Sequence, residues 1–188
     1  MPGPPLAESE QRRRRFEAVY DAHRRAILGY ALRRTGSADD AADVIAETFL
    51  TAWRRLDDIP PDPEARLWLY GVARRVLANH HRGERRRSAL ADRLRSDLAL
   101  GYDPPEADGE QVLIAGAFRR LTDADRELLA LAAWEGLDYG QIARVLGCSR
   151  NAVRIRLFRA RKRFAAELAA GPARSAPPGV HVTHGGLL

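Results

Sequence analysis

Polar and cationic side chains recur at helical spacing between residues 150 and 162, where they have the chemistry to contact a DNA groove. Arginine and asparagine can hydrogen-bond base edges, and the major groove, about 12 Å wide, admits one α-helix. The residues of this surface are Asn151, Ile155, Phe158 and Lys162, flanked by Arg150, Arg154 and Arg159. A role in reading DNA therefore requires a helix that presents these side chains while its opposite side is packed.

The surrounding residues predict the helix pair that would present this surface. Asp138 and Gln141 have the spacing of a capping box at the start of one short helix. Gly147 can end that helix in a left-handed conformation, and Ser149 can cap the next one. The second helix has an apolar stripe made of Val153, Leu157, Ala160 and Phe164. This pattern is typical of a helix-turn-helix; the alternative is a basic amphipathic helix on a solvated surface, which the caps and the turn disfavour.

The composition indicates a polyanionic partner, since the formal net charge is +6 and the sequence pI is about 10.2. The single cysteine, Cys148, excludes an intrachain disulfide and fits a reducing compartment. The longest apolar run, Leu128 to Trp134, is far shorter than the roughly 20 residues that span a bilayer. The N-terminus has no apolar signal segment. We therefore expect a cytoplasmic protein without membrane insertion.

Two helices are predicted in the N-terminal part, after a stretch to about Glu10 that we expect to be disordered. The first helix begins near Phe16, and its core positions are Phe16, Val19, Tyr20, His23, Ile27, Tyr30 and Ala31. The second is capped by Ser37, and its core positions are Ala42, Ile45, Phe49, Ala52 and Leu56. Its opposite face carries Asp43, Glu47, Leu50 and Arg54. Composition alone favours a solvated charged face over a docking surface for another protein.

A proline-rich loop, LDDIPPDP at residues 56–63, separates this helix from a basic one. Asp62 is expected to cap the basic helix, which runs from Glu64 to about Arg82 and buries Leu69, Val72, Ala73, Val76 and Leu77. Arginines beside Trp68 form the kind of surface on which single-stranded bases stack, although Trp68 is equally well explained as a core residue.

The sequence predicts an all-α protein of two small helical domains joined by a flexible linker, with the helix-turn-helix in the C-terminal domain. The segment GERRR (Gly83 to Arg87) closes the first unit, and the acidic GYDPPEADGE is typical of a linker. Helices at 112–121 and 123–135 are expected to precede the helix-turn-helix. The expected organisation is a disordered tail at 1–11, a first domain at 12–84, a linker at 85–111, a second domain at 112–170 and a second tail at 171–188.

In this order, the motifs resemble the small two-domain sigma factors of bacterial RNA polymerase, the extracytoplasmic-function group. The segment DAADVIAETFLTAWRRL (Asp40 to Leu56) is similar to the family's polymerase-binding helix. The segment WLYGVARRVLANHHR (Trp68 to Arg82) is similar to its minus-ten recognition helix. Leu121 to Leu168 resembles the domain that binds the minus-thirty-five element, so the resemblance covers about residues 12–168.

The resemblance implies a role for each of these surfaces. It turns the outward face of the second helix into the polymerase-binding surface, made of Asp43, Glu47, Leu50 and Arg54. The loop at 57–63 lies where the family holds a flipped-out base of the melted minus-ten strand. The minus-ten set is Asp62, Arg66, Trp68, Arg74, Arg75 and Arg82. The implied partners are core RNA polymerase, promoter DNA and an anti-sigma factor, with no cofactor or metal.

In the minus-thirty-five domain we expect two kinds of DNA contact. Base edges would be contacted by Ser149, Arg150, Asn151, Arg154 and Ile155. Phosphates would be held by Arg156, Arg159 and Arg161. The sequence departs from the family pattern at Ala46, at Arg75 and in the run Ala152 to Arg156, so we expect an unusual promoter preference.

The leading alternative is a stand-alone helix-turn-helix regulator, which would leave the outward face and the proline-rich loop without a role. A metal-dependent phosphohydrolase built on Asp43, Glu47 and the adjacent His80 and His81 lacks ligand spacing, a phosphate loop and a nucleophile–base pair. The basic recognition helix likewise disfavours a pure adaptor. We therefore expect a protein without enzymatic activity.

Overall fold

Apolar residues spaced three to four apart make helices of almost the whole chain that the structure describes. The computed structural model describes residues 6–35, 37–95 and 109–171. Its elements are α1 (Leu6–Leu32), α2 (Ala38–Arg54), the short 3-10 helix η1 (Leu56–Asp58), α3 (Glu64–Arg95), α4 (Gly109–Arg120), α5 (Asp123–Ala133), α6 (Tyr139–Leu146) and α7 (Arg150–Ala170). The predicted all-α class is confirmed, and those ranges contain no strand.

Side-chain caps begin α2, α6 and α7 where the sequence predicts them. Ser37 Oγ accepts a hydrogen bond from the backbone N–H of Asp40 at 3.1 Å, at the start of α2. The capping box of α6 is complete, because Asp138 accepts from the N–H of Gln141 and the Gln141 side chain accepts from the N–H of Asp138. Gly147 ends α6 with a φ of +65°, the left-handed conformation that favours glycine. The helix-turn-helix is thus confirmed in its local geometry.

The α1–α3 unit packs around the predicted stripes, with two corrections. On α1, the prediction for Tyr20 was wrong, because this residue is 38% exposed. Ile27, Tyr30 and Leu69 are fully buried, as expected. On α2, however, the prediction for Ala42 was wrong, because Ala42 is exposed. Its core side is offset by one position and is formed by Ala41, Val44, Thr48, Phe49 and Ala52. Thr48 is tolerated there because its hydroxyl donates to the carbonyl of Val44 at 2.6 Å.

Two helices are longer than the sequence indicates. The first begins at Leu6, so residues 6–11 of the expected tail are helical. The segment Gly83 to Arg87 does not end a helix, because α3 continues through it to Arg95. Arginines are good helix formers, which offsets the single glycine. Of the expected linker at 85–111, residues 85–95 belong to α3 and residues 109–111 to α4. Residues 96–108 lie outside the described residues, as do residues 1–5 and 172–188 of the two tails.

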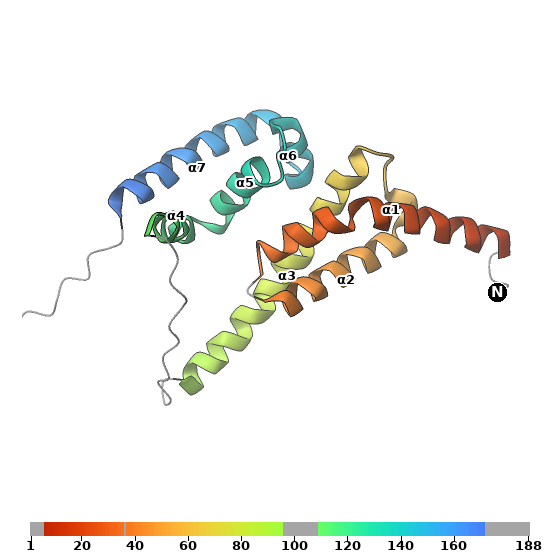
Figure 1. Ribbon diagram of the computed structural model, residues 1–188, viewed down its shortest axis with the longest axis horizontal. Helices are drawn as coiled ribbons and strands as arrows, with labels where there is room; N and C mark the ends of the chain where they lie inside the picture. Colours follow the sequence, from red (N-terminus) through yellow and green to blue (C-terminus); the bar gives the residue numbers. More distant parts are fainter. Residues whose placement is uncertain (1–5, 36, 96–108, 172–188) are drawn as a thin grey trace, which may run out of the picture.

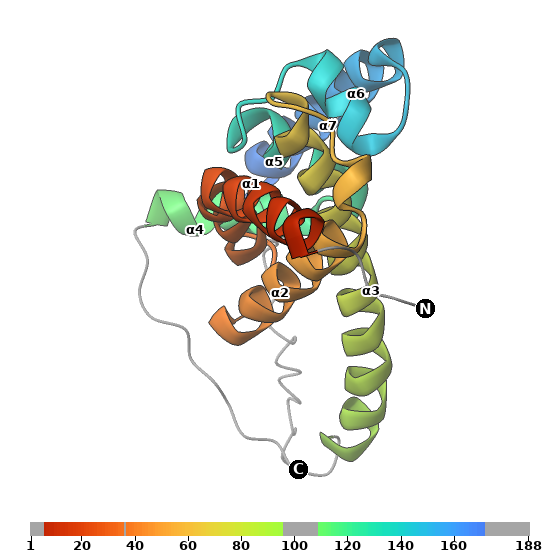
Figure 2. The same ribbon diagram turned by 90° about the vertical axis from the view of Figure 1, so that its right-hand side faces the viewer.

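The α4–α7 unit lies against the α1–α3 unit, while the C-terminal part of α3 projects away from both (Figures 1 and 2). Their buried apolar residues form one continuous cluster. At the contact, α3 and α6 approach closely, since a Cβ on Gly71 would stand in van der Waals contact with the carbonyl oxygen of Val145, at 3.7 Å. The two units therefore share one core.

Candidate polymerase and nucleic-acid surfaces

The recognition helix α7 has a packed side and a bare basic side, because its apolar stripe faces α5 and α6. Val153, Leu157 and Ala160 are at most 1% exposed. The predicted DNA-contacting residues are all exposed: Ser149, Arg150, Asn151, Arg154, Ile155, Arg156, Arg159 and Arg161. Phe158, which shares this side, is 70% exposed, an unusual environment for a phenyl ring. Such a surface has the shape and charge for a DNA groove.

A paired hydrogen bond holds the orientation of α7. Arg163 donates from Nε and from its second guanidinium nitrogen to the two carboxylate oxygens of Asp125, at 2.7 and 2.6 Å. These bonds from Arg163 lower the pKa of Asp125, although burial works against them. Because Asp125 is in the first turn of α5, the pair ties the recognition helix to the helix behind it.

Two of the predicted base readers are linked to each other. Arg154 donates a hydrogen bond to the side-chain oxygen of Asn151 at 3.0 Å, one helical turn away. The bond uses the amide oxygen of Asn151 and so turns its amino group away from Arg154. The two side chains are therefore positioned as a pair on the exposed side of α7.

On α2, the predicted polymerase-binding residues lie on one exposed face. Asp43, Glu47, Leu50 and Arg54 are all exposed, and Leu50 is 42% exposed. Their side chains make no cross-element ion pair that the structure records, so the face is open to a partner. An exposed leucine among carboxylates and an arginine suits a protein surface with both apolar and basic groups.

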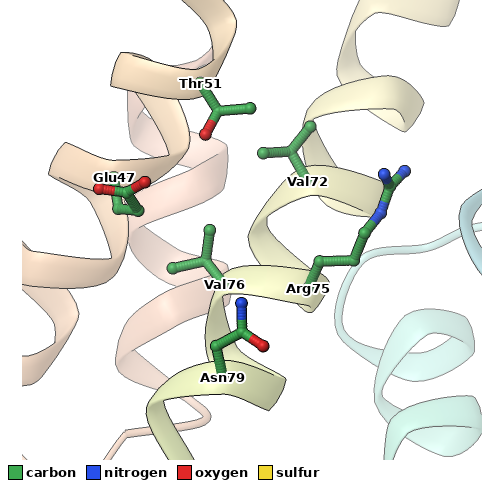
Figure 3. A pocket seen from close by; sticks show the side chains of 6 residues that line it. All are labelled: Glu47, Thr51, Val72, Arg75, Val76 and Asn79. Atoms are coloured by element: carbon green, nitrogen blue, oxygen red, sulfur yellow. The ribbon is translucent and has the colours of Figure 1, made fainter.

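A groove of about 400 Å³ runs between this face and α3 (Figure 3). It is lined by Glu47, Thr51, Val72, Arg75, Val76 and Asn79. Arg75 Nε donates to the carbonyl oxygen of Gly71 at 3.1 Å, so its guanidinium is directed along α3. The groove joins the predicted polymerase and minus-ten surfaces. Sequence reasoning missed Thr51 and Asn79, although each follows a chosen residue by four positions and thus shares its face.

The other predicted minus-ten residues differ in how far they are exposed. Arg74 and Arg82 are exposed, whereas Arg66 is half-buried. Trp68 is also half-buried and packs against the core, and the Arg55 guanidinium lies 5.6 Å from its ring centroid. Trp68 is thus anchored in the core and leaves some ring surface accessible.

Asp62 was expected to cap α3, and this prediction was wrong. The helix begins at Glu64, and the Asp62 carboxylate is directed toward His23. Its Oδ1 lies 3.0 Å from Nε2 of His23, whose side chain is 9% exposed. His23 is therefore a packing residue that contacts the end of the proline-rich loop.

The described residues contain no group of three or more His, Cys, Asp or Glu side chains arranged to hold a metal ion. His80 instead lies 3.2 Å from Asp40 of α2. None of the helices in the described part of the chain is long and apolar enough to cross a membrane.

Comparisons with known proteins match both helical units. Residues 19–87 match the family model for Sigma-70 region 2, and residues 111–164 match that for Sigma-70, region 4. The ECF RNA polymerase sigma factor SigL of Mycobacterium tuberculosis is 34% identical over 145 residues, which are 76% of this chain and 82% of SigL. The RNA polymerase sigma-H factor of Pseudomonas aeruginosa is 30% identical over 171 residues, 84% of this chain and 89% of that protein.

A solved structure shows the same likeness in three dimensions. It is the structure of CnrH in complex with the cytosolic domain of CnrY, which aligns with a TM-score of 0.58 and 28% sequence identity. The alignment covers 82% of this chain and 88% of CnrH. The relatives therefore match across both helical units, in the same order along the chain.

Proposed function

Since the chain belongs to the extracytoplasmic-function group of sigma-70 RNA polymerase sigma factors and directs promoter-specific transcription initiation, we propose how its surfaces divide that task. Residues 12–84 would bind core polymerase and the minus-ten element, and residues 112–170 the minus-thirty-five element. The linker at 85–111 would join them. The observation that carries this division is the separation of one open mixed-charge face on α2 from one open basic face on α7.

Asp43, Glu47, Leu50 and Arg54 form the proposed polymerase-binding surface. Support comes from their common exposure on α2 and from the exposed leucine at its centre. Reversing both carboxylate charges should weaken the complex with core polymerase. The matched control is Glu17→Arg, which reverses an exposed carboxylate on α1 outside this face.

We assign minus-ten binding to the loop before α3 and to Arg66, Trp68, Arg74, Arg75 and Arg82. The groove beside Arg75 and the accessible part of the Trp68 ring support the assignment, because unpaired bases need a stacking surface beside cations. Asp62 belongs to this set as a loop residue and not as a phosphate contact, since its carboxylate lies beside His23.

Minus-thirty-five binding is assigned to α7. Ser149, Arg150, Asn151, Arg154 and Ile155 would face base edges, while Arg156, Arg159 and Arg161 would hold phosphates. Their exposure and the coupled Asn151–Arg154 pair support this division. Each good paired contact to a base is worth about 1–3 kcal/mol of discrimination.

An anti-sigma factor is the further partner that we propose, acting on this chain in the cytoplasm. The solved CnrH structure is a complex with the cytosolic domain of CnrY, and that pairing supports the idea by likeness alone. The finding that no described helix could span a membrane is consistent with a cytoplasmic place of action.

One transcription assay tests the proposal. Core polymerase, the purified chain and a library of genomic fragments are combined, and transcript start sites are mapped. Initiation at defined sites only when the chain is added is the expected result, and Asp43→Arg with Glu47→Arg should abolish it. Tight and specific promoter binding by the chain without polymerase, together with no stimulated initiation, would instead support the stand-alone regulator.

A further inference from the structure

The N-terminal end of α1 reaches the loop that precedes α3. The match to Sigma-70 region 2 starts at residue 19, whereas α1 begins at Leu6. The extra turns carry four consecutive arginines, Arg12 to Arg15. Only two of the four face the loop, because successive residues of a helix point about 100° apart.

Arg12 holds the beginning of the loop. One of its guanidinium nitrogens donates to the carbonyl oxygen of Trp53 at 3.0 Å, and the other to the carboxylate of Asp57, also at 3.0 Å. The Trp53 carbonyl is among the last of α2, where a helix has no partner of its own for its C=O groups. A cation at a helix C-terminus is also favoured by the helix dipole.

Arg15 holds the middle of the same loop. Its guanidinium donates to the carbonyl oxygen of Ile59 at 3.1 Å and lies 3.5 Å from Asp57. The Ile59 side chain is 3% exposed, so the loop is anchored from two sides at this point. Arg12, Arg15 and His23 share one side of α1. They thus contact the loop at Asp57, Ile59 and Asp62, near its beginning, middle and end.

Arg13 and Arg14 provide the contrast. They pair within α1, with Glu17 at 2.9 Å and with Glu10 at 3.2 Å. Their side chains are 70% and 75% exposed, and such pairs contribute little to stability. The same run of four arginines therefore contains two loop contacts and two solvent-facing residues of equal charge.

We propose that Arg12 and Arg15 are positioning residues that set the conformation of loop 55–63 for capture of an unpaired minus-ten base. The inference rests on the proposed function of that loop. Capture of one base in preference to the others requires a preformed pocket, because a loop that can rearrange accommodates different bases. Hydrogen bonds from two rigid guanidinium groups, to the Asp57 carboxylate and to the Ile59 carbonyl, supply that order before the DNA arrives.

The test compares two double variants of the full chain bound to core polymerase, Arg12→Ala with Arg15→Ala and Arg13→Ala with Arg14→Ala. Both lose two charges from the same helix. The probe is a pool of single-stranded DNA with ten randomised positions, from which bound molecules are sequenced. We expect the first variant to lose base preference at one or two positions by about fivefold or more, the low end of one base contact. The second variant should retain the wild-type preference.

Further measurements separate positioning from general weakening. Core polymerase affinity and the salt dependence of DNA binding should change equally in both double variants. Arg15→Lys should recover part of the preference, since an ammonium can still donate to the Ile59 carbonyl. If the first double variant loses its helical circular dichroism, Arg15→Met, which keeps the aliphatic stem, takes its place with the same expected loss.

The outcomes are distinct. Equal base preference in both double variants would overturn the positioning role while leaving the proposed function intact. A wild-type chain that selects no sequence when bound to core polymerase would instead refute the minus-ten function on which the inference rests.

Discussion

Arg34, just after α1, and Glu135, just after α5, form an ion pair at 3.0 Å that joins the two helical units. Their side chains are 10% and 3% exposed. The pair belongs to a larger set, in which Arg33 also contacts Glu135 at 2.7 Å and Arg34 contacts Glu127 at 2.8 Å. Glu64 and Arg144 form a further pair between α3 and α6. The contact between the units is thus both apolar and ionic.

Glu135→Gln should destabilise the chain by about 3 kcal/mol, because it leaves two arginines facing a buried neutral group. We expect a single thermal transition for the wild type, since the two units share one core, and a broadened or split transition for the variant. Calorimetry measures both the loss of stability and the shape of the thermal transition. Glu17→Gln, which removes an exposed carboxylate paired within α1, should change stability by less than about 0.5 kcal/mol. Equal effects of the two substitutions on stability would contradict a stabilising role for Glu135 at the contact between the two units.

The two units should separate when the chain binds polymerase and promoter. Elements named for positions minus ten and minus thirty-five are about 25 base pairs apart, or roughly 85 Å along straight DNA. Helices packed as closely as α3 and α6 do not span that length. Dyes on Ala42→Cys and Ala133→Cys, in a Cys148→Ser background, should show efficient energy transfer in the free chain and little in the complex. Unchanged energy transfer in the complex would show that the chain contacts only one of the two promoter elements at a time.

Alkaline pH should weaken the same contact. Burial raises the pKa of Tyr30 well above its ordinary value of 10.0, and the nearby Glu127 carboxylate adds to the effect. Burial likewise raises the pKa of Tyr70. Folding therefore favours the protonated phenols, so their contribution is complete below about pH 10 and is lost as the pH rises above it. Urea midpoints between pH 9 and 11 should fall, and the fall should be smaller in Tyr30→Phe.

Arg154→Ala should change the base preference of DNA binding, whereas Arg159→Ala should change the affinity for all sequences. Loss of Arg154 would remove one of the proposed base contacts and free the Asn151 amide oxygen, so base preference should relax at one or two promoter positions by about 1–3 kcal/mol. Loss of Arg159 should weaken binding to all sequences alike and flatten the salt dependence. Binding of the polymerase complex to a promoter library, at several salt concentrations, distinguishes the two. A uniform shift in both variants would refute the division into base and phosphate contacts.

Gly147→Ala should lower stability by about 1 kcal/mol, because a residue with a side chain must adopt the left-handed conformation there. A Cβ at this position would meet nothing within 4 Å, so the backbone is the only source of the loss. Gly116→Ala, inside α4, is the control and should raise stability by about 0.5–1 kcal/mol. Urea denaturation measures both changes. An unchanged free energy of unfolding in Gly147→Ala would show that the turn relaxes without losing its helix contacts.

Local sequence determined where most helices lie, the caps of α2, α6 and α7, and the exposed surface of α7. A capping box, a glycine turn and an apolar stripe involve residues within a few positions of one another, and backbone geometry alone relates them. Residues 138–164 therefore folded as predicted, down to the left-handed Gly147. The exposed face of α2 was also predicted, because it follows from the same periodicity.

Only the tertiary structure decided which helix sides meet. Ala42 was assigned to the core because alanine suits either environment, and the packing of α1 and α3 selected Ala41 instead. The same holds for the arginine run, in which Arg12 and Arg15 bind a loop more than forty residues away while Arg13 and Arg14 face solvent. The pairing of Arg34 with Glu135 spans 101 residues. Contacts of this range depend on how whole helices pack, and no local pattern of residues encodes them.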